Sequence, residues 1–319
     1  MAGLRAVALV TAAAALALAA CSTGGGRAAS SVSTTTKPTP TASSTPAPSS
    51  PAATPAAVVP RLRHVVLVVM ENLGYDAAVP AFATLAARGA RADDYYAVAH
   101  PSLPNYLALD TGSTWGITSD CTDCYVSGPD LAQQLSAAGI SWGAFMEGLP
   151  SPCWLGSSTG NYAGKHDPFR YVRQVRGSPS LCGRIRPLTE LYADLSGPPG
   201  SLPSFAWVTP DLCHDGHDCD PAQAARWLEG FVGRVTSSPS WDKDAAVFVT
   251  WDEAEGGDDR GGGGHVLTFA LSPSIPAGRR VSTPASHYSL LRTVEEALGL
   301  PLLGHAGDPG RSDLAAVWG

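Results

Sequence analysis

The sequence predicts one α/β domain, a three-layer α/β/α sandwich with a mostly parallel central sheet. Several continuous apolar runs are typical of strands buried on both faces of a sheet. These runs alternate with segments that carry apolar residues at helical spacing, and acidic residues follow several of the runs directly. Residues 61–319 suffice for one large domain with its own core. No internal repeat is visible, which excludes solenoids and propellers.

The expected elements follow one another in a regular order. The first strand spans 64–70, and a helix over 80–88 follows with Gly89 as its stop. Further strands are expected at 140–146, 204–208, 245–250 and 265–271, and further helices at 130–138, 188–195, 221–235 and 288–298. Alternating strands and helices place parallel strands side by side, with helices on both faces of the sheet.

The N-terminal residues predict export. Residues 1–20 combine Arg5 with an apolar run that is too short for a transmembrane helix of about 20 residues, as in a signal peptide. Its end, Leu18-Ala19-Ala20-Cys21, resembles a bacterial lipobox, so Cys21 is expected to carry the lipid anchor of a membrane lipoprotein. The alternative is an ordinary secretory signal that borders a cysteine, which would release a secreted protein.

Residues 21–60 are expected to form a disordered tether before the catalytic domain, 61–319. The tether is rich in Ser, Thr, Pro, Ala and Gly and contains no acidic residue. The whole chain has 21 Lys and Arg against 28 Asp and Glu, a formal charge of −7, and all the acidic residues follow position 60. An acidic domain repels phosphate backbones, so a nucleic-acid partner is not expected.

Six cysteines remain after Cys21, an even number in a chain expected to leave the cytoplasm. Cys121 and Cys124 have the spacing of half a zinc ribbon, but no second such motif completes a four-thiolate site. Disulfides are therefore favoured. Among the fifteen possible pairings, proximity along the chain suggests Cys121–Cys124, Cys153–Cys182 and Cys213–Cys219.

Acidic and amide side chains follow three of the expected strands. They are Glu71 and Asn72, Asp211, and Asp252 and Glu253. The carboxyl ends of parallel strands lie at one edge of a sheet, where ligands of α/β proteins collect. Converging carboxylates repel one another unless a cation lies among them, so the sequence predicts a divalent metal ion of unknown identity and number.

Other polar residues allow both a functional and a purely structural interpretation. Ser102 is expected at a helix start, where it serves either as a cap or as a group facing a phosphoryl ligand. Lys165 and His166 precede Pro168, as in a solvated helix start. The loop 211–220 holds four Asp and two His, and is either a ligand loop or a disulfide-closed surface loop. His265 follows a glycine-rich loop, and His287 precedes the last helix.

Taken in order, these segments resemble the phosphoesterase family that unites secreted acid phosphatases with non-specific phospholipases C. The motifs are Val68-Val-Met-Glu71-Asn72, His100-Pro-Ser102-Leu-Pro-Asn105-Tyr106, Lys165-His166-Asp-Pro-Phe169, Thr209-Pro-Asp211-Leu-Cys-His214-Asp-Gly-His217-Asp218, Thr250-Trp-Asp252-Glu253 and Ser286-His287-Tyr. The resemblance covers nearly all of 64–304 and implies the fold of the alkaline-phosphatase superfamily. The bacterial acid phosphatases, including phosphatidylinositol-3-phosphatases, are the most similar branch.

The resemblance also implies roles for the residues. Ser102 matches the nucleophile, and Ser rather than Thr at this place favours the phosphatase branch. Glu71, Asn72, Asp252 and Glu253 match metal ligands, to which Asp211 and His287 are added. The catalytic histidines would be among His100, His166, His214 and His217, and the groups that bind the substrate phosphate would be among Asn105, Lys165 and His265.

The expected function is metal-dependent hydrolysis of phosphoric monoesters through a phosphoserine, on small molecules or lipid headgroups such as phosphoinositides. Two alternatives remain open at this point. One is a phospholipase C that cleaves phosphodiester headgroups, and the other is a surface lipoprotein whose acidic cluster holds a cation without catalysis.

Overall fold

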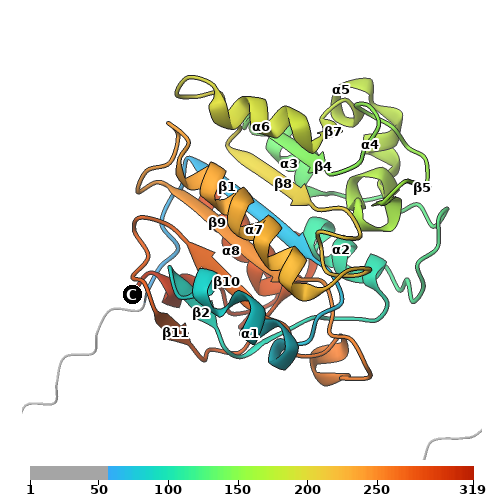
Figure 1. Ribbon diagram of the computed structural model, residues 1–319. Coiled ribbons are helices and arrows are strands. Elements are labelled where there is room, and N and C mark those ends of the chain that lie inside the picture. Colours follow the sequence, from blue (N-terminus) through green and yellow to red (C-terminus); the bar gives the residue numbers. More distant parts are fainter. Residues whose placement is uncertain (1–56) are drawn as a thin grey trace, which may run out of the picture. The chain divides into compact units, whose positions relative to one another are not determined.

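The computed structural model describes residues 57–319 (Figure 1). The expected signal peptide, the lipidation site Cys21 and nearly all of the expected tether lie outside the described residues. The described part forms one compact unit by its own contacts. None of its helices is long and apolar enough to cross a membrane.

The helices and strands follow one another along the chain in this order. The strands are β1 (His64–Met70), β2 (Ala90–Ala92), β3 (Tyr95–Tyr96), β4 (Trp142–Met146), β5 (Ser158–Thr159), β6 (Tyr162–Ala163), β7 (Ile185–Pro187), β8 (Phe205–Thr209), β9 (Ala245–Trp251), β10 (Thr268–Leu271), β11 (Arg279–Val281) and β12 (Ala285–Ser286). The α-helices are α1 (Tyr75–Ala86), α2 (Ser102–Thr111), α3 (Leu131–Ala137), α4 (Arg173–Gly177), α5 (Pro179–Cys182), α6 (Leu188–Ser196), α7 (Pro221–Thr236) and α8 (His287–Leu298). Two short 3-10 helices, η1 (Gly164–His166) and η2 (Pro168–Tyr171), precede α4.

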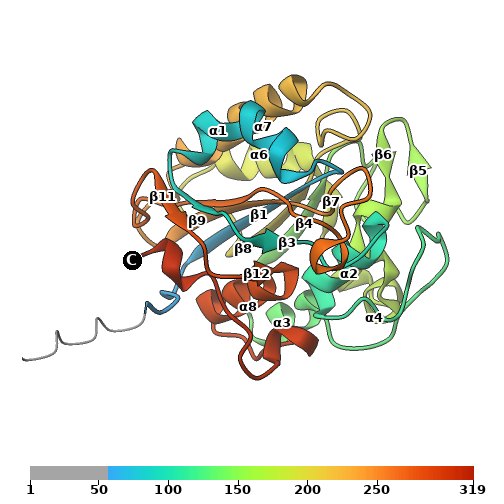
Figure 2. The same cartoon turned by 90° about the horizontal axis from the view of Figure 1, so that it is seen from below.

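The central sheet has eight strands in the order β11-β2-β10-β9-β1-β8-β4-β7. All neighbouring pairs are parallel except the two that β10 makes, with β9 and with β2. Helices α1, α6 and α7 cover one face, and α2, α3 and α8 lie on the other (Figure 2). The expected three-layer sandwich with a mostly parallel sheet is therefore confirmed.

Burial on both faces explains why the central strands are apolar runs. Six of the seven residues of β1 and all seven of β9 are buried. The strands pair over their full length, from His64 beside Ala245 to Met70 beside Trp251. Bulky aromatic side chains, among them Trp142, Trp207 and Phe82, fill the core on either side. The described chain joins this core at the amino end of β1.

The structure differs from the expected elements mainly at the edges of the sheet. The strand expected at 265–271 begins only at Thr268 and runs antiparallel to β9. The first helix begins at Tyr75, five residues before the expected start, and holds Pro80 within it. Short edge strands such as β2 and β11 were not expected, because three residues are too few to show a periodicity.

Helix α2 is buried along all ten of its residues. A helix without a solvent-facing side lies in the core, where its polar residues need partners. The helix ends at Gly112, whose φ of 72° is left-handed. A Cβ atom there would lie 2.3 Å from the carbonyl oxygen of Leu303, so the close approach of these two backbones requires glycine.

All three disulfides that proximity suggested are present. Cys121 is bonded to Cys124, Cys153 to Cys182, and Cys213 to Cys219. The bonded cysteines are 3, 29 and 6 residues apart along the chain. The zinc-ribbon alternative is wrong for Cys121 and Cys124.

Two buried carboxyl groups meet where α2 passes the start of α3. Asp110 Oδ1 accepts from Leu131 N at 3.3 Å, and Asp130 Oδ1 accepts from Gln133 N at 2.6 Å as the cap of α3. The second oxygen of each has no hydrogen-bond partner among the described residues. Burial and the charge of Asp130 raise the pKa of Asp110 well above its usual range, and burial raises the pKa of Asp130 to about 6.

This pair predicts that Asp110→Asn stabilises the protein at pH 8. The pKa values of both acids are raised in the folded state. The pair therefore contributes fully to the free energy of unfolding at low pH, when it is protonated, and this contribution is lost as the pH rises through about 6 and above. The new amide would stay neutral at every pH and keep the acceptor for Leu131 N. We therefore expect the free energy of unfolding to rise by about 1 to 3 kcal/mol at pH 8 and to change little at pH 5. Urea unfolding at both pH values measures it. An equal effect at both pH values would contradict the raised pKa of Asp110.

Candidate active site

Four parallel strands bring polar side chains to one edge of the sheet. Glu71 follows β1, Asp252 follows β9, Glu147 follows β4, and Asp211 follows β8 after one proline. Backbone hydrogen bonds continue the pairing past the strand ends, from Asp252 N to Met70 O at 2.9 Å and from Glu147 N to Thr209 O at 3.0 Å. The carboxylates are thus positioned by the rigid core of the sheet.

Ser102 is the first residue of α2 and has no exposed surface. Its Oγ lies 3.0 Å from Glu71 Oε2 and 3.1 Å from Glu253 Oε1, so residues from α2 and from the ends of β1 and β9 meet at one atom. A single hydroxyl proton can be donated to only one of the two carboxylates at a time. The arrangement therefore has one more acceptor than its donor can satisfy.

Further buried atoms around this point lack hydrogen-bond partners among residues 57–319. They are Glu71 Oε1, Asn72 Oδ1, Asp252 Oδ2, Asp215 Oδ2 and His166 Nε2. His166 Nε2 lies 3.2 Å from Glu71 Oε1, and its Nδ1 lies 3.5 Å from Asp215 Oδ2, both without hydrogen-bond geometry. Unpaired buried polar atoms are rare in folded proteins, and five in one cluster indicate a missing positive partner.

The pKa values of the buried acids also indicate a missing positive partner. Burial raises the pKa of Glu71 to about 8, although Tyr106 and Lys165 lower it. Burial raises the pKa of Asp215 to about 7, with Glu71 adding to the shift. Burial, together with the charges of Glu71 and Glu253, raises the pKa of Asp252 well above its usual range. These shifts show how unfavourable the ionised cluster is without a cation.

The residues present fit a divalent metal ion. Glu71, Asn72, Asp252 and Glu253 offer carboxylate and amide oxygens, and Ser102 adds a hydroxyl. Oxygen-rich sets of this kind suit magnesium, calcium or manganese, and His166 beside them widens the choice to softer ions. Asn72 has a left-handed φ of 46°, and its N–H donates to Asp252 Oδ1 at 2.9 Å, which fixes its orientation beside the cluster.

His100 connects this cluster to the surface. Its Nδ1 contacts Glu253 Oε2, and its Nε2 lies 3.1 Å from Asp258 O. Burial lowers the pKa of His100, but the contacts with Glu253 and the Asp258 carbonyl outweigh this, and the net shift is upward. A cavity of about 390 Å³ opens here, lined by Asn72, His100, Glu253 and the glycine-rich loop that follows them.

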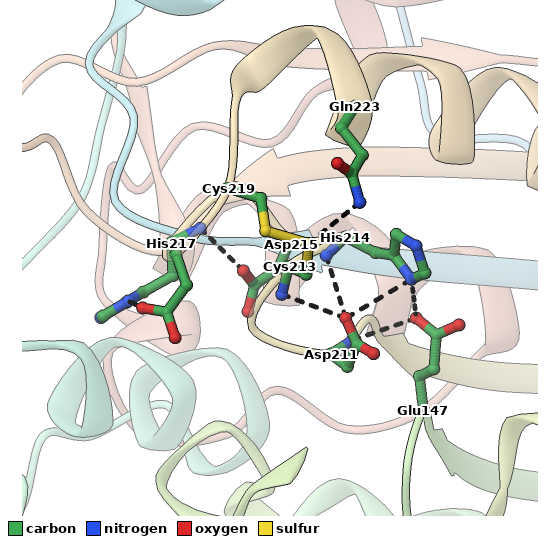
Figure 3. Close-up of a disulfide and its surroundings, with 9 residues drawn as sticks. Glu147, Asp211, Cys213, His214, Asp215, His217, Cys219 and Gln223 are labelled. Carbon is green, nitrogen blue, oxygen red and sulfur yellow. Dashed lines mark hydrogen bonds and ion pairs between the residues drawn. A yellow bond between two sulfur atoms is a disulfide. The ribbon is translucent and has the colours of Figure 1, made fainter. Parts of the chain in front are cut away.

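The loop 211–220 divides its side chains between two groups. Figure 3 shows that His217 and His214 extend in opposite directions from the loop, which the Cys213–Cys219 disulfide closes. The His217 ring lies 6.1 Å from that of His166, and its Nδ1 lies 2.6 Å from Asp218 Oδ1. His217 therefore faces the Ser102 cluster.

His214 belongs to a second group with Glu147 and Asp211. Its Nδ1 lies 3.0 Å from Glu147 Oε2 (Figure 3). Its ring stacks on Trp227 at a centroid distance of 5.9 Å. These three residues offer ligand atoms within 4.8 Å of one another, so they too could hold a cation. Asp211 Oδ1 already accepts from Cys213 N and His214 N, each at 3.0 Å. Asp211 was expected as a ligand at the Ser102 cluster, and the structure places it in this second group.

Of the residues expected to bind phosphate, Lys165 lies at the cluster, and Asn105 is hydrogen-bonded to the backbone. The Asn105 side chain accepts from Val98 N and Ala99 N at 3.0 Å and donates to Ala99 O at 2.7 Å. Its Nδ2 also donates to Pro101 O at 3.2 Å, so the structure places Asn105, expected to bind phosphate, where it holds the backbone before Ser102. Lys165 lies at the cluster and pairs with Asp120 at 2.9 Å.

Two expected histidines are engaged elsewhere. Both ring nitrogens of His287 have protein partners, Asp252 O at 2.6 Å and the Tyr95 hydroxyl at 3.0 Å. His287 thus supports the backbone of Asp252, and the structure places its ring nitrogens on protein partners and not at the cluster where it was expected as a metal ligand. The His265 ring, expected to bind phosphate, stacks on Tyr75 at 4.0 Å, and its Nε2 lies 2.9 Å from Asp93 O.

Sequence reasoning missed Glu147, Tyr106 and Asp120. Glu147 carries the same signal as Glu71, an acid directly after a buried strand. Tyr106 stacks on His166 at 5.2 Å, and its hydroxyl is buried without a partner among residues 57–319. Asp120 lies in a long loop, where no periodic pattern marks it.

Comparisons with known proteins agree with this geometry. A family model described as "Phosphoesterase family" matches residues 60–301. The chain is 33% identical over 274 residues to a phosphatidylinositol-3-phosphatase of Mycobacterium tuberculosis, covering 83% of this chain and 85% of the relative. It is 29% identical over 247 residues to an acid phosphatase of Aspergillus niger, covering 74% of this chain and only 58% of that longer protein.

Solved structures support the fold alone, since sequence identity to them is low. A Vibrio parahaemolyticus protein of the alkaline phosphatase superfamily matches with a TM-score of 0.51 at 14% identity, over 80% of this chain and 72% of that one. Murine ectonucleotide pyrophosphatase/phosphodiesterase 5 matches with a TM-score of 0.52 at 12% identity, over 77% and 97%. The expected alkaline-phosphatase-like fold is confirmed.

The buried acids predict a metal effect that can be measured without any substrate. In chelator, Asp252→Asn should unfold at a higher temperature than the wild type, because it removes an uncompensated buried charge and keeps the acceptor for Asn72 N. Added divalent metal at a hundredfold excess over its Kd should stabilise the wild type by about 2.7 kcal/mol, and the variant much less. Thermal scans with magnesium, calcium, manganese and zinc test this. Asp123→Asn, on the exposed loop, is the control. Equal responses of wild type and Asp252→Asn would contradict the assignment.

Proposed function

Because the chain belongs to the Phosphoesterase family, we propose that it is a metal-dependent phosphoric monoester hydrolase with Ser102 as its nucleophile. The family assignment and the relatives make the protein a hydrolase of phosphoric esters. The observation that carries the proposal is the position of Ser102 Oγ, between Glu71 and Glu253 and surrounded by unpaired buried ligand atoms. A surface protein that only binds a solute does not need such a hydroxyl.

The chain's own residues supply the parts of a two-step transfer. Ser102 Oγ attacks phosphorus and gives its proton to Glu71 or Glu253, while the bond from phosphorus to the leaving oxygen breaks. His217 protonates the leaving oxygen, and Asp218 orients its ring. In the second step a water attacks the phosphoserine and gives its proton to His217, the bond from phosphorus to Oγ breaks, and the glutamic acid formed in the first step returns its proton to Ser102 Oγ. A divalent ion held by Glu71, Asn72, Asp252 and Glu253 would lower the pKa of the serine and offset charge on the phosphoryl oxygens.

The substrate class is part of the proposal. Relatives named acid phosphatase and phosphatidylinositol-3-phosphatase suggest a screen that begins with aryl phosphates and phosphoinositides. A phospholipase C acting on phosphodiesters would use the same site, but it releases diacylglycerol and a phospho-alcohol instead of inorganic phosphate. Product analysis therefore separates the two activities.

The N-terminal expectations add a location. We propose export and anchoring through a lipid on Cys21, consistent with the lipobox-like sequence before it. Cell fractionation tests this, because the wild type should be recovered with membranes and Cys21→Ser in soluble fractions. Recovery of both in the same fraction would favour an ordinary secretory signal.

Ser102→Ala tests the nucleophile. We expect the rate of phosphate release from an aryl phosphate to fall by at least a thousandfold, and chelator to abolish the wild-type rate in a way that added metal reverses. The variant should stay folded, since it removes only one hydroxyl. If Ser102→Ala keeps more than a small fraction of the wild-type rate, the assignment is wrong.

His217→Gln and His214→Gln form a matched pair on one loop. Loss of the general acid should lower kcat/KM, which reports the phosphoserine-forming step, by roughly a hundredfold for alkyl phosphates and much less for nitrophenyl phosphate, whose leaving group needs no proton. His214→Gln should leave this leaving-group dependence unchanged, because His214 faces Glu147 and Trp227. Steady-state kinetics on both substrates measure it, and equal losses in the two variants would argue against His217.

A further inference from the structure

Asp120 contacts two separate parts of the active site. It lies in the loop between α2 and α3, and its side chain is 28% exposed. One oxygen, Oδ1, accepts from Leu103 N at 3.0 Å, and the other, Oδ2, accepts from Lys165 Nζ at 2.9 Å. The carboxylate thus joins the start of the nucleophile helix to η1, which carries both Lys165 and His166.

At the start of α2, Asp120 takes a position that a phosphate was expected to fill. A helix start offers free N–H groups, but Leu103 N already donates to Asp120, and Pro104 has no N–H to offer. A carboxylate in this position also interacts favourably with the positive end of the helix dipole. Together with Asn105, which holds the backbone at Val98 and Ala99, Asp120 fixes the peptide on either side of Ser102.

The second contact concerns the charge of Lys165. Burial lowers the pKa of Lys165, but Asp120, Glu71 and Asp252 outweigh this and raise it above the usual value. The ammonium group is therefore hydrogen-bonded to Asp120 and also interacts with the charges of Glu71 and Asp252. A phosphate bound at Ser102 would meet an ammonium that Asp120 already partly neutralises.

The loop that carries Asp120 is held at several points. The Cys121–Cys124 disulfide follows it directly, and the Trp115 indole donates to Thr111 Oγ1 at 2.9 Å. Val126 N donates at 2.9 Å to the carbonyl oxygen of Tyr171, the last residue of η2. A carboxylate on a braced loop can hold its two partners in place.

We propose that Asp120 is a positioning residue with two separate effects, on Ser102 through Leu103 N and on phosphate affinity through Lys165. The first effect fixes the nucleophile for in-line attack. The second weakens the hold of Lys165 on inorganic phosphate and so favours product release. The proposal rests on the proposed function of Ser102.

Two substitutions separate the two oxygens. Asp120→Asn keeps an oxygen for Leu103 N and removes the charge, so kcat for an aryl phosphate should change less than about threefold, and Ki for inorganic phosphate should fall about three- to tenfold. Asp120→Ala also removes the acceptor, so kcat should fall at least tenfold in addition. Asp123→Asn, the exposed neighbour three residues on, should change neither.

A double-mutant cycle of Asp120 and Lys165 measures whether the two residues act together on Ki for inorganic phosphate, which a merely structural role of Asp120 would not change. In a Lys165→Ala background, Asp120→Asn should no longer lower Ki, because its effect acts through the ammonium group. A lower Ki that persists in this background, or equal kcat losses in Asp120→Asn and Asp120→Ala, would overturn the proposal. Should Asp120→Ala fail to fold, Asp120→Asn and the cycle still decide the effect on phosphate.

The outcome is distinguishable from failure of the proposed function. If Ser102→Ala stays active, Ser102 is not the nucleophile, and both the proposed function and this inference fail. If Ser102→Ala is inactive but the Asp120 variants behave like Asp123→Asn, the proposed function stands and only the role of Asp120 is wrong.

Discussion

The burial of several carboxylates at one edge of the sheet is the constraint on which the rest of the site depends. Glu71, Asp252 and Asp215 are fully buried, and Glu253 is nearly so. Such groups are stable as anions only beside positive charge, and Lys165 already shares its charge with Asp120. The rigid strands that hold these acids prevent them from moving apart, so the fold itself creates the demand for a cation.

The interior of the fold could be predicted from the sequence, and its edges could not. β1 was predicted with its observed bounds, because an unbroken β-branched run has no other stable place than a sheet buried on both faces. The short strand β2 was missed, because its three residues pair only through contacts with β10 and β11. Long-range pairing of this kind leaves no periodic signal in the local sequence.

The candidate site divides in the same way. Residues directly after buried strands, such as Glu71 and Asp252, were expected at the site and lie there, because a strand end fixes the place of the next side chain. The histidines were harder, because the same residue type serves different roles: His287 supports a backbone carbonyl, and His265 stacks on Tyr75. Asp120 reaches the site only through tertiary folding of its loop.

The described chain enters the domain at the amino end of β1, whereas Ser102 and the acids lie beyond its carboxyl end. Seven residues of strand separate the two, roughly 23 Å at about 3.3 Å per residue. The point where the described chain enters the domain and the cluster around Ser102 therefore lie at opposite ends of β1. A support or fusion partner joined to residue 57 would thus be attached away from the Ser102 cluster, at the other end of the strand.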